Sequence, residues 1–203
     1  MSQDLFNPLD KTNLGKSVID ALMATKAVKL GDLPKFKGAG VYAIYYSGQF
    51  APYAALSALN RKDPKHPIYI GKAIPQGGRK GLTTDASLDS HALSARLHKH
   101  AESIAATSDL KVTEFGCRYL AVDDIWIGLG ETLLIQRFSP LWNQVVEGFG
   151  NNDPGKGRHK GMRPLWDELH PGRAWARRLK PAKQSREQIL AMVGDYMAKL
   201  GGG

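Results

Sequence analysis

The chain of 203 residues is 42% hydrophobic and 23% charged, which is typical of a globular domain with a sizeable core and argues against a disordered or membrane-embedded chain. Its 28 Lys and Arg outnumber its 19 Asp and Glu, so the formal net charge is +9. No apolar run approaches the roughly 18 residues of a membrane span, and the N-terminus lacks the basic and apolar stretches of a secretory signal. We therefore expect a cytoplasmic protein, in which the lone Cys117 forms neither an internal disulfide nor a cysteine-based zinc site.

Helical periodicity and strand-like alternation succeed one another along the chain. This pattern indicates an α/β (α+β) protein with three strands. In chain order it predicts a helix over 14–27, a strand over 40–46, a helix over 53–61, a strand over 68–71, a helix over 90–106, a strand over 112–122, a helix over 125–138 and two short helices over 164–169 and 185–200.

The excess of positive charge is concentrated near the C-terminus. Residues 156–186 contain ten basic and two acidic residues, a net charge of +8. Such a concentration favours a polyanionic partner, with nucleic acid as the first candidate. A solvated basic face that aids solubility is the alternative.

Two predicted strands each place a tyrosine beside a glycine. The first begins Gly40-Val41-Tyr42, and the second contains Tyr69-Ile70-Gly71. Taken alone, both tyrosines are ordinary sheet residues, because aromatic side chains are favoured in strands. Their functional interpretation depends on the polar residues that follow them.

Four further polar residues stand where folding alone does not require them. Arg96 and His100 are four residues apart and share one face of a predicted helix, although a solvated helix face would show the same spacing. Glu131 is the one acid within an apolar predicted helix, where an acid is costly unless it is paired or binds metal. A place in the first turns of that helix, where an acid is favoured, is the alternative. Asn143 follows Pro-Leu-Trp at 140–142.

In this order, these residues resemble the motifs of the GIY-YIG nuclease family. Val41 stands where the family motif has isoleucine, a difference of one methylene that we consider harmless. The wider context resembles the small type II restriction endonucleases of this family that cut the palindrome CCGCGG. The segments that carry this closer resemblance are Phe-Lys-Gly-Ala-Gly-Val-Tyr at 36–42, Pro-Ile-Tyr-Ile-Gly-Lys-Ala at 67–73, Pro-Leu-Trp-Asn at 140–143 and His-Pro-Gly-Arg at 170–173.

The resemblance implies a fold and a domain organisation. A small, mostly antiparallel three-stranded sheet would be flanked by helices. The chain would form a single nuclease domain over 1–203, made of an N-terminal helical extension 1–36, a core 37–146 and a basic C-terminal extension 147–203. An insertion over 47–66, where many family members have a tight hairpin, is similar to the restriction enzymes and is a place for specificity contacts.

For phosphodiester hydrolysis, the resemblance implies that Tyr42 activates the attacking water and that His100 relays its proton. A phenol with a pKa of about 10 is a poor base until its anion is stabilised. Which of Tyr42, His100 and Lys72 is the general base therefore stays open. Arg96 would contact phosphate oxygens through its planar guanidinium and stabilise charge in the transition state.

The remaining site residues have supporting roles in this interpretation. Glu131 is the one carboxylate suited to hold Mg2+, so one ion per active site is expected rather than two. Tyr69 would hydrogen-bond the phosphate or the water, and Asn143 would orient its neighbours.

The implied substrate is double-stranded DNA, bound by a homodimer whose two-fold symmetry matches that of a palindrome. Arg and Lys are the usual readers of guanine, although most basic residues at such interfaces contact phosphate. A restriction role also requires a cognate DNA methyltransferase, with no stable complex implied. The candidate DNA-binding residues are Lys72, Arg61, Lys62, Lys65, Arg79, Lys80, Lys156, Arg158 and Lys160.

Two other functions stay open. A non-catalytic nucleic-acid-binding protein could share the fold, but it would need no acid within an apolar helix. A homing or repair nuclease of the same family would normally carry further domains, for which 203 residues leave little room.

Overall fold

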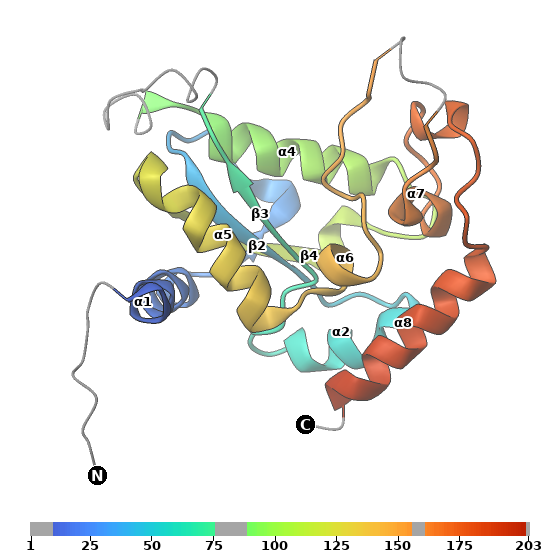
Figure 1. The fold of residues 1–203 in the computed structure, drawn as a ribbon, viewed down its shortest axis with the longest axis horizontal. Coiled ribbons are helices and arrows are strands. Elements are labelled where there is room, and N and C mark those ends of the chain that lie inside the picture. Colours follow the sequence, from blue (N-terminus) through green and yellow to red (C-terminus); the bar gives the residue numbers. More distant parts are fainter. Residues whose placement is uncertain (1–9, 76–88, 156–160, 202–203) are drawn as a thin grey trace.

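The computed structural model describes residues 10–75, 89–155 and 161–201. Its centre is an antiparallel sheet with the strand order β1-β4-β2-β3 (Figure 1). The strands are β1 Val28–Lys29, β2 Gly40–Tyr46, β3 Tyr69–Ala73 and β4 Phe115–Ala121.

The predicted α+β fold is confirmed, with one strand more than the three expected. The additional β1 pairs Val28 with Cys117 and Lys29 with Gly116 on β4. Two residues are too few to show an alternating pattern, and the helix predicted over 14–27 reached to the edge of this strand. That helix, α1 Lys11–Ala24, ends earlier, where the Thr25 hydroxyl donates to the Leu22 carbonyl.

The central strand β2 is buried along its whole length, because both faces of the sheet are covered. Its even-numbered residues, such as Tyr42, belong to a core that includes residues of α4 Ala92–Ala105 and of the C-terminal third of the chain. Its odd-numbered residues face α1 and α5 Asp124–Phe138. Figure 1 shows α1 and α5 on the same side of the sheet.

The elements around the unit formed by the sheet, α1, α4 and α5 range from 3-10 turns of three residues to the last helix, α8 Arg186–Gly201, of 16 residues. The region of the predicted insertion forms α2, which packs against the last helix, α8. None of the helices within the described residues is long and apolar enough to cross a membrane. The remaining bounds are η1 Leu30–Asp32, η2 Ala51–Tyr53, α2 Ala54–Asn60, η4 Val112–Glu114, α6 Leu141–Gln144, α7 Leu165–Leu169, η6 Ala176–Arg178 and α8 Arg186–Gly201.

The C-terminal third shares its core with the sheet. The Phe149 ring lies 4.5 Å from that of Trp142 and 5.0 Å from that of Trp166 on α7, measured between ring centroids. Trp142 also packs against Phe115 of β4, at 5.7 Å. Phe149 and Trp166, which lie after residue 146, are therefore part of the core that supports the even-numbered side chains of β2.

Candidate active site

A buried hydrogen bond joins β2 to α4. The Tyr42 hydroxyl oxygen and His100 Nε2 are 2.7 Å apart, and both side chains are buried. Burial raises the pKa of Tyr42 far above its ordinary value, and the adjacent Tyr69 adds to the effect. Burial, with the positive charges of Arg96 and Arg173, lowers the pKa of His100 well below 6.5. At neutral pH the pair is thus an uncharged phenol beside an uncharged imidazole.

The two glycines beside the motif tyrosines allow a close approach of neighbouring strands. A Cβ atom on Gly71 would collide with the ring and hydroxyl of Tyr42. A Cβ atom on Gly40, whose φ is 157°, would collide with the backbone of β4 at Leu120. Packing against Tyr42 is therefore sufficient to explain Gly71, and close contact with the backbone of β4 is sufficient to explain Gly40.

Arg96 is held by the backbone that follows α6. Its Nη2 donates to the Gly150 carbonyl at 2.6 Å, and its Nη1 donates to Asn152 Oδ1 at 3.3 Å. A Cβ atom on Gly150 would collide with the Tyr69 hydroxyl. Tyr69 and Arg96 therefore meet at the same stretch of backbone.

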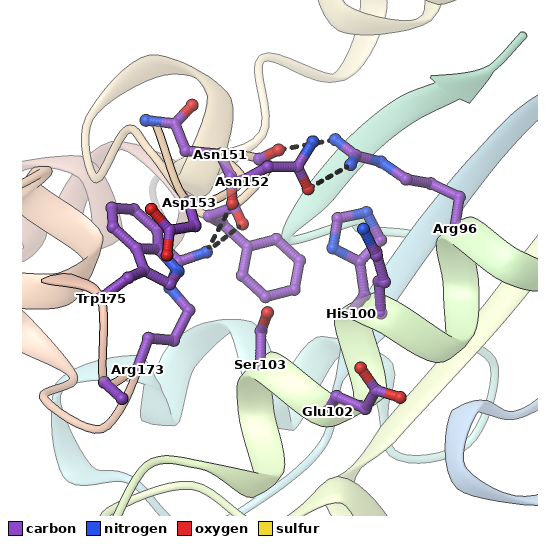
Figure 2. A pocket seen from close by; sticks show the side chains of 13 residues that line it. Arg96, His100, Glu102, Ser103, Asn151, Asn152, Asp153, Arg173 and Trp175 are labelled. Atoms are coloured by element: carbon purple, nitrogen blue, oxygen red, sulfur yellow. Dashed lines mark hydrogen bonds between the residues drawn. The ribbon is translucent and has the colours of Figure 1, made fainter. Parts of the chain in front are cut away.

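The same stretch also contacts the histidine. Phe149 stacks on His100 with ring centroids 4.5 Å apart and an interplanar angle of 21°. Figure 2 shows His100 and Arg96 on one side of residues 149–152 and Arg173 on the other. A single loop thus borders a shallow pocket of about 270 Å³ and touches Tyr69, Arg96 and His100.

A larger cleft of about 970 Å³ lies between β3, α4 and α5, and Tyr69, Arg96 and Lys99 line it. Lys72 of β3 and Glu131 of α5 also line it, and they form an ion pair with 2.7 Å between Nζ and Oε2. Tyr42 is fully buried. Tyr69 and Arg96 line the cleft and also contact the loop at 149–152.

Glu131 is the eighth residue of α5 and lies in the middle of the helix. Glu131 therefore does not lie in the first turn of α5, as the alternative interpretation expected. The acid of the first turn is Asp124. The acid is instead paired with Lys72 at the wall of the cleft. Within residues 10–75, 89–155 and 161–201, no group of three or more His, Cys, Asp and Glu side chains could hold a metal ion.

Asn143 binds the backbone of the second motif. Its Oδ1 accepts from the Ile70 N–H at 2.8 Å, and its Nδ2 donates to the Ile70 carbonyl at 2.9 Å. Both polar atoms of the amide are thus engaged at the outer edge of β3. Asn143 holds the strand that carries Tyr69 and Lys72, and its role of orienting its neighbours in the reaction stays a prediction.

Residues 34–197 match the family model described as the Eco29kI GIY-YIG domain. The chain belongs to the Eco29kI GIY-YIG family. It is a restriction-type nuclease at this level, and its substrate is DNA. A search of curated proteins finds no significant match.

The predicted DNA-binding residues that the structure describes do not all lie at the cleft. Lys72 lines the cleft. Arg61 and Lys62 lie at the opposite end of β2, because Asn60 binds the Tyr46 carbonyl whereas Gly40 pairs with Ala73 beside the cleft. That separation is about 20 Å along the strand. Lys65 is paired with Asp63 at 2.9 Å. Outside the described residues lie Arg79, Lys80, Lys156, Arg158 and Lys160.

Two cationic residues of the site were missed from the sequence. Lys99 lines the cleft one turn after Arg96 on α4, and that i, i+3 spacing could have indicated it. Arg173 contacts the loop at 149–151. It ends the His-Pro-Gly-Arg segment at 170–173 that contributes to the family resemblance, but that segment alone assigns it no role.

Proposed function

We propose that this protein is a Mg2+-dependent type II restriction endonuclease that hydrolyses double-stranded DNA at a GC-rich palindrome, with CCGCGG as the expected site. The observation that supports it most directly is the Tyr42–His100 hydrogen bond, which lies beside Tyr69 and Arg96 at the wall of a charged cleft. A second buried phenol–imidazole pair, Tyr53–His170 at 2.6 Å, does not border this cleft, so it is the position of the Tyr42–His100 pair beside Tyr69, Arg96 and the cleft that supports a catalytic role.

Water activation by Tyr42 accords with the ionisation of the pair. In the His100 tautomer whose Nε2 carries no proton, the neutral Tyr42 hydroxyl donates to Nε2, so a proton taken from water by Tyr42 is matched by one passed to His100. Burial, together with the charges of Arg96 and Arg173, disfavours the resulting imidazolium in the free protein. The negative charge of a bound phosphate offsets that effect.

Access to Tyr42 requires a movement of side chains. Tyr42 is fully buried, and Tyr69 and Arg96 line the cleft beside it. DNA entering the cleft must therefore displace at least one of these two side chains before water reaches the Tyr42 hydroxyl. Arg96 also interacts with Tyr42 and Tyr69, so a bound phosphate would compete with these hydroxyls for its guanidinium.

The donor set at the cleft fits one Mg2+ ion, held by Glu131. Mg2+ binds through one or two carboxylates and completes its shell with water and phosphate oxygens, and a lone carboxylate at the wall of an open cleft meets that requirement. When bound, the ion would supply positive charge to the phosphate. Lys72 holds Glu131 in place and adds a second cation to the same wall.

The recognition of a palindrome leads us to propose a homodimer, since two-fold protein symmetry then matches that of the DNA. Host DNA would need protection by a cognate methyltransferase. We also expect the enzyme to act in the cytoplasm, where that DNA lies.

Digestion of plasmid DNA tests the proposal. A plasmid with one CCGCGG site and an otherwise matched plasmid without it are incubated with the protein in Mg2+ and in EDTA, beside Glu131→Gln as the control variant. We expect one linear product, from the first plasmid only and in Mg2+ only. Metal-dependent cutting of both plasmids would retain the nuclease and reject the site. Tight binding without cutting in any condition would favour the non-catalytic alternative.

A further inference from the structure

Arg173 is buried, although it belongs to the basic segment that the sequence assigns to a polyanion or to solvent. It lies between α7 and η6 and forms a two-point ion pair with Asp167. The Nε–Oδ1 and Nη2–Oδ2 distances are 2.7 and 2.5 Å. Its guanidinium carbon lies 4.7 Å from the ring centroids of both Trp166 and Trp175. This arginine is therefore not available to DNA.

The remaining N–H groups of Arg173 bind the loop that touches the active site. Nη1 donates to the carbonyls of Phe149 and Asn151 at 2.9 and 3.0 Å, and Nη2 donates to that of Gly148 at 2.9 Å. With the two bonds to Asp167, all five guanidinium N–H donors are engaged. Lysine has only three donors and no planar fork, so it cannot reproduce this set.

The opposite side of the same loop holds two residues of the proposed reaction. The Gly150 carbonyl accepts from Arg96, and the Phe149 ring stacks on His100 (Figure 2). Arg173 thus binds the carbonyls of residues 148, 149 and 151, and the carbonyl between them binds Arg96. A shift of the loop would displace the Arg96 guanidinium and the His100 ring together.

We propose that Arg173, supported by Asp167, is a positioning residue for DNA cleavage, which acts through residues 148–151 on Arg96 and His100 and makes no contact with DNA. This inference rests on the proposed function. A misplacement of about 1 Å costs about 100-fold in rate. Loss of the hydrogen bonds of the Arg173 guanidinium should therefore lower the rate of the chemical step far more than the affinity for DNA.

The test compares Arg173→Lys with Arg118→Lys. Arg118 is an equally buried arginine of β4, bound to the Thr25 carbonyl and to Asp63, and its cation lies over Tyr45 on the other face of β2. Single-turnover cleavage, DNA affinity in Ca2+ and melting temperature are measured for both. We expect Arg173→Lys to cleave about 100-fold more slowly with an affinity within about threefold of the parent. Arg118→Lys should lose stability without losing cleavage rate.

A double variant separates positioning from general loss of structure. If Arg173 acts through Arg96 and His100, Arg173→Lys in an Arg96→Lys background should slow cleavage by clearly less than about 100-fold, because one of the two groups that it positions is already lost. A further drop of about 100-fold, or an unchanged rate in Arg173→Lys alone, would overturn the proposal.

Two outcomes need their own control. If Arg173→Lys does not fold, Asp167→Asn serves instead, since its amide oxygen can still accept from Nε. It must then show the same separation of rate from affinity, and an unchanged rate overturns the proposal. If the parent protein itself does not cleave DNA, the proposed function has failed. The separate positioning claim then fails as well if Arg173→Lys leaves the chemical shifts of the His100 ring unchanged.

Discussion

The Tyr42 hydroxyl and His100 Nε2 lie 2.7 Å apart inside the core, although 58 residues separate them in the chain. Tyr42 belongs to the central strand β2, and His100 belongs to α4. Neither group carries a charge at neutral pH, because burial opposes ionisation of both. The pair can therefore pass a proton without first having to lose one to solvent.

Tyr42→Phe removes the hydroxyl and keeps the ring. We expect cleavage to fall by about 10²- to 10⁴-fold, the usual contribution of a positioned acid or base. Stability should fall by about 1–3 kcal/mol, because His100 loses its partner, which lowers the melting temperature by about 2–4 °C per kcal/mol. Tyr45→Phe is the matched control: it lies on the opposite face of β2, and its hydroxyl meets Met23 Sδ at 3.5 Å. Equal cleavage rates in the two variants would reject a role for the Tyr42 hydroxyl.

Glu131→Gln keeps the size of the side chain and removes its charge. Cleavage should be abolished at every Mg2+ concentration while binding of uncut DNA is retained, because the expected metal ligand is lost. The ion pair with Lys72 is partly exposed, so stability should change by no more than about 1 kcal/mol. Glu114→Gln is the control, since this half-buried acid bonds Tyr46 away from the cleft. Comparable turnover by Glu131→Gln would contradict the single-carboxylate site.

The stability of the protein should decrease as the pH falls below 6.5. His100 and His170 are buried, and burial lowers the pKa of both in the folded state. The unfolded chain then binds protons that the folded chain does not, which destabilises the fold by up to about 1.4 kcal/mol per pH unit for each histidine. Urea unfolding at pH 7.5 to 5.0 measures the slope. His170→Gln, which removes the group between Asp109 and Tyr53, should reduce it. A slope that does not change would show that His170 does not contribute.

DNA affinity should fall steeply as the salt concentration rises, because the basic side chains that bind the phosphates displace counterions from them. Lys99→Ala removes a cation from the wall of the cleft and should reduce the slope of log K against log salt by about one. Arg61→Ala, at the far end of β2, provides the comparison. A reduction for Arg61→Ala alone would place the DNA across the insertion instead of the cleft.

The sequence predicted the parts of the fold that have local signatures. The strand over 40–46 begins and ends as expected, because Gly40 and the run of β-branched and aromatic residues mark it. The strand predicted over 112–122 is shorter, since Val112–Glu114 forms a turn of 3-10 helix before β4 begins. The two-residue β1 has no pattern of its own, and pairing with β4 creates it.

The site was predictable where a motif carried it and unpredictable where only distant contacts define it. Tyr69, Arg96 and Glu131 meet at the cleft as their motifs suggest. Arg173, in contrast, belongs in the sequence to the basic segment and to the His-Pro-Gly-Arg segment at 170–173, and neither assigns it a role. What distinguishes it is burial between two tryptophans and the carbonyls of a loop about 24 residues away, and no local pattern encodes such a contact.

The hydrogen bonds between Asn143 and Ile70 affect how readily this molecule associates with other copies at high concentration. β3 is the edge of the sheet, and an edge strand with free N–H and carbonyl groups can recruit a strand from another molecule. The Asn143 amide satisfies both outward groups of Ile70, as a neighbouring strand would. One side chain thus occupies the outward hydrogen-bonding groups of Ile70 on this edge strand and protects the strand beside the cleft against edge-to-edge aggregation.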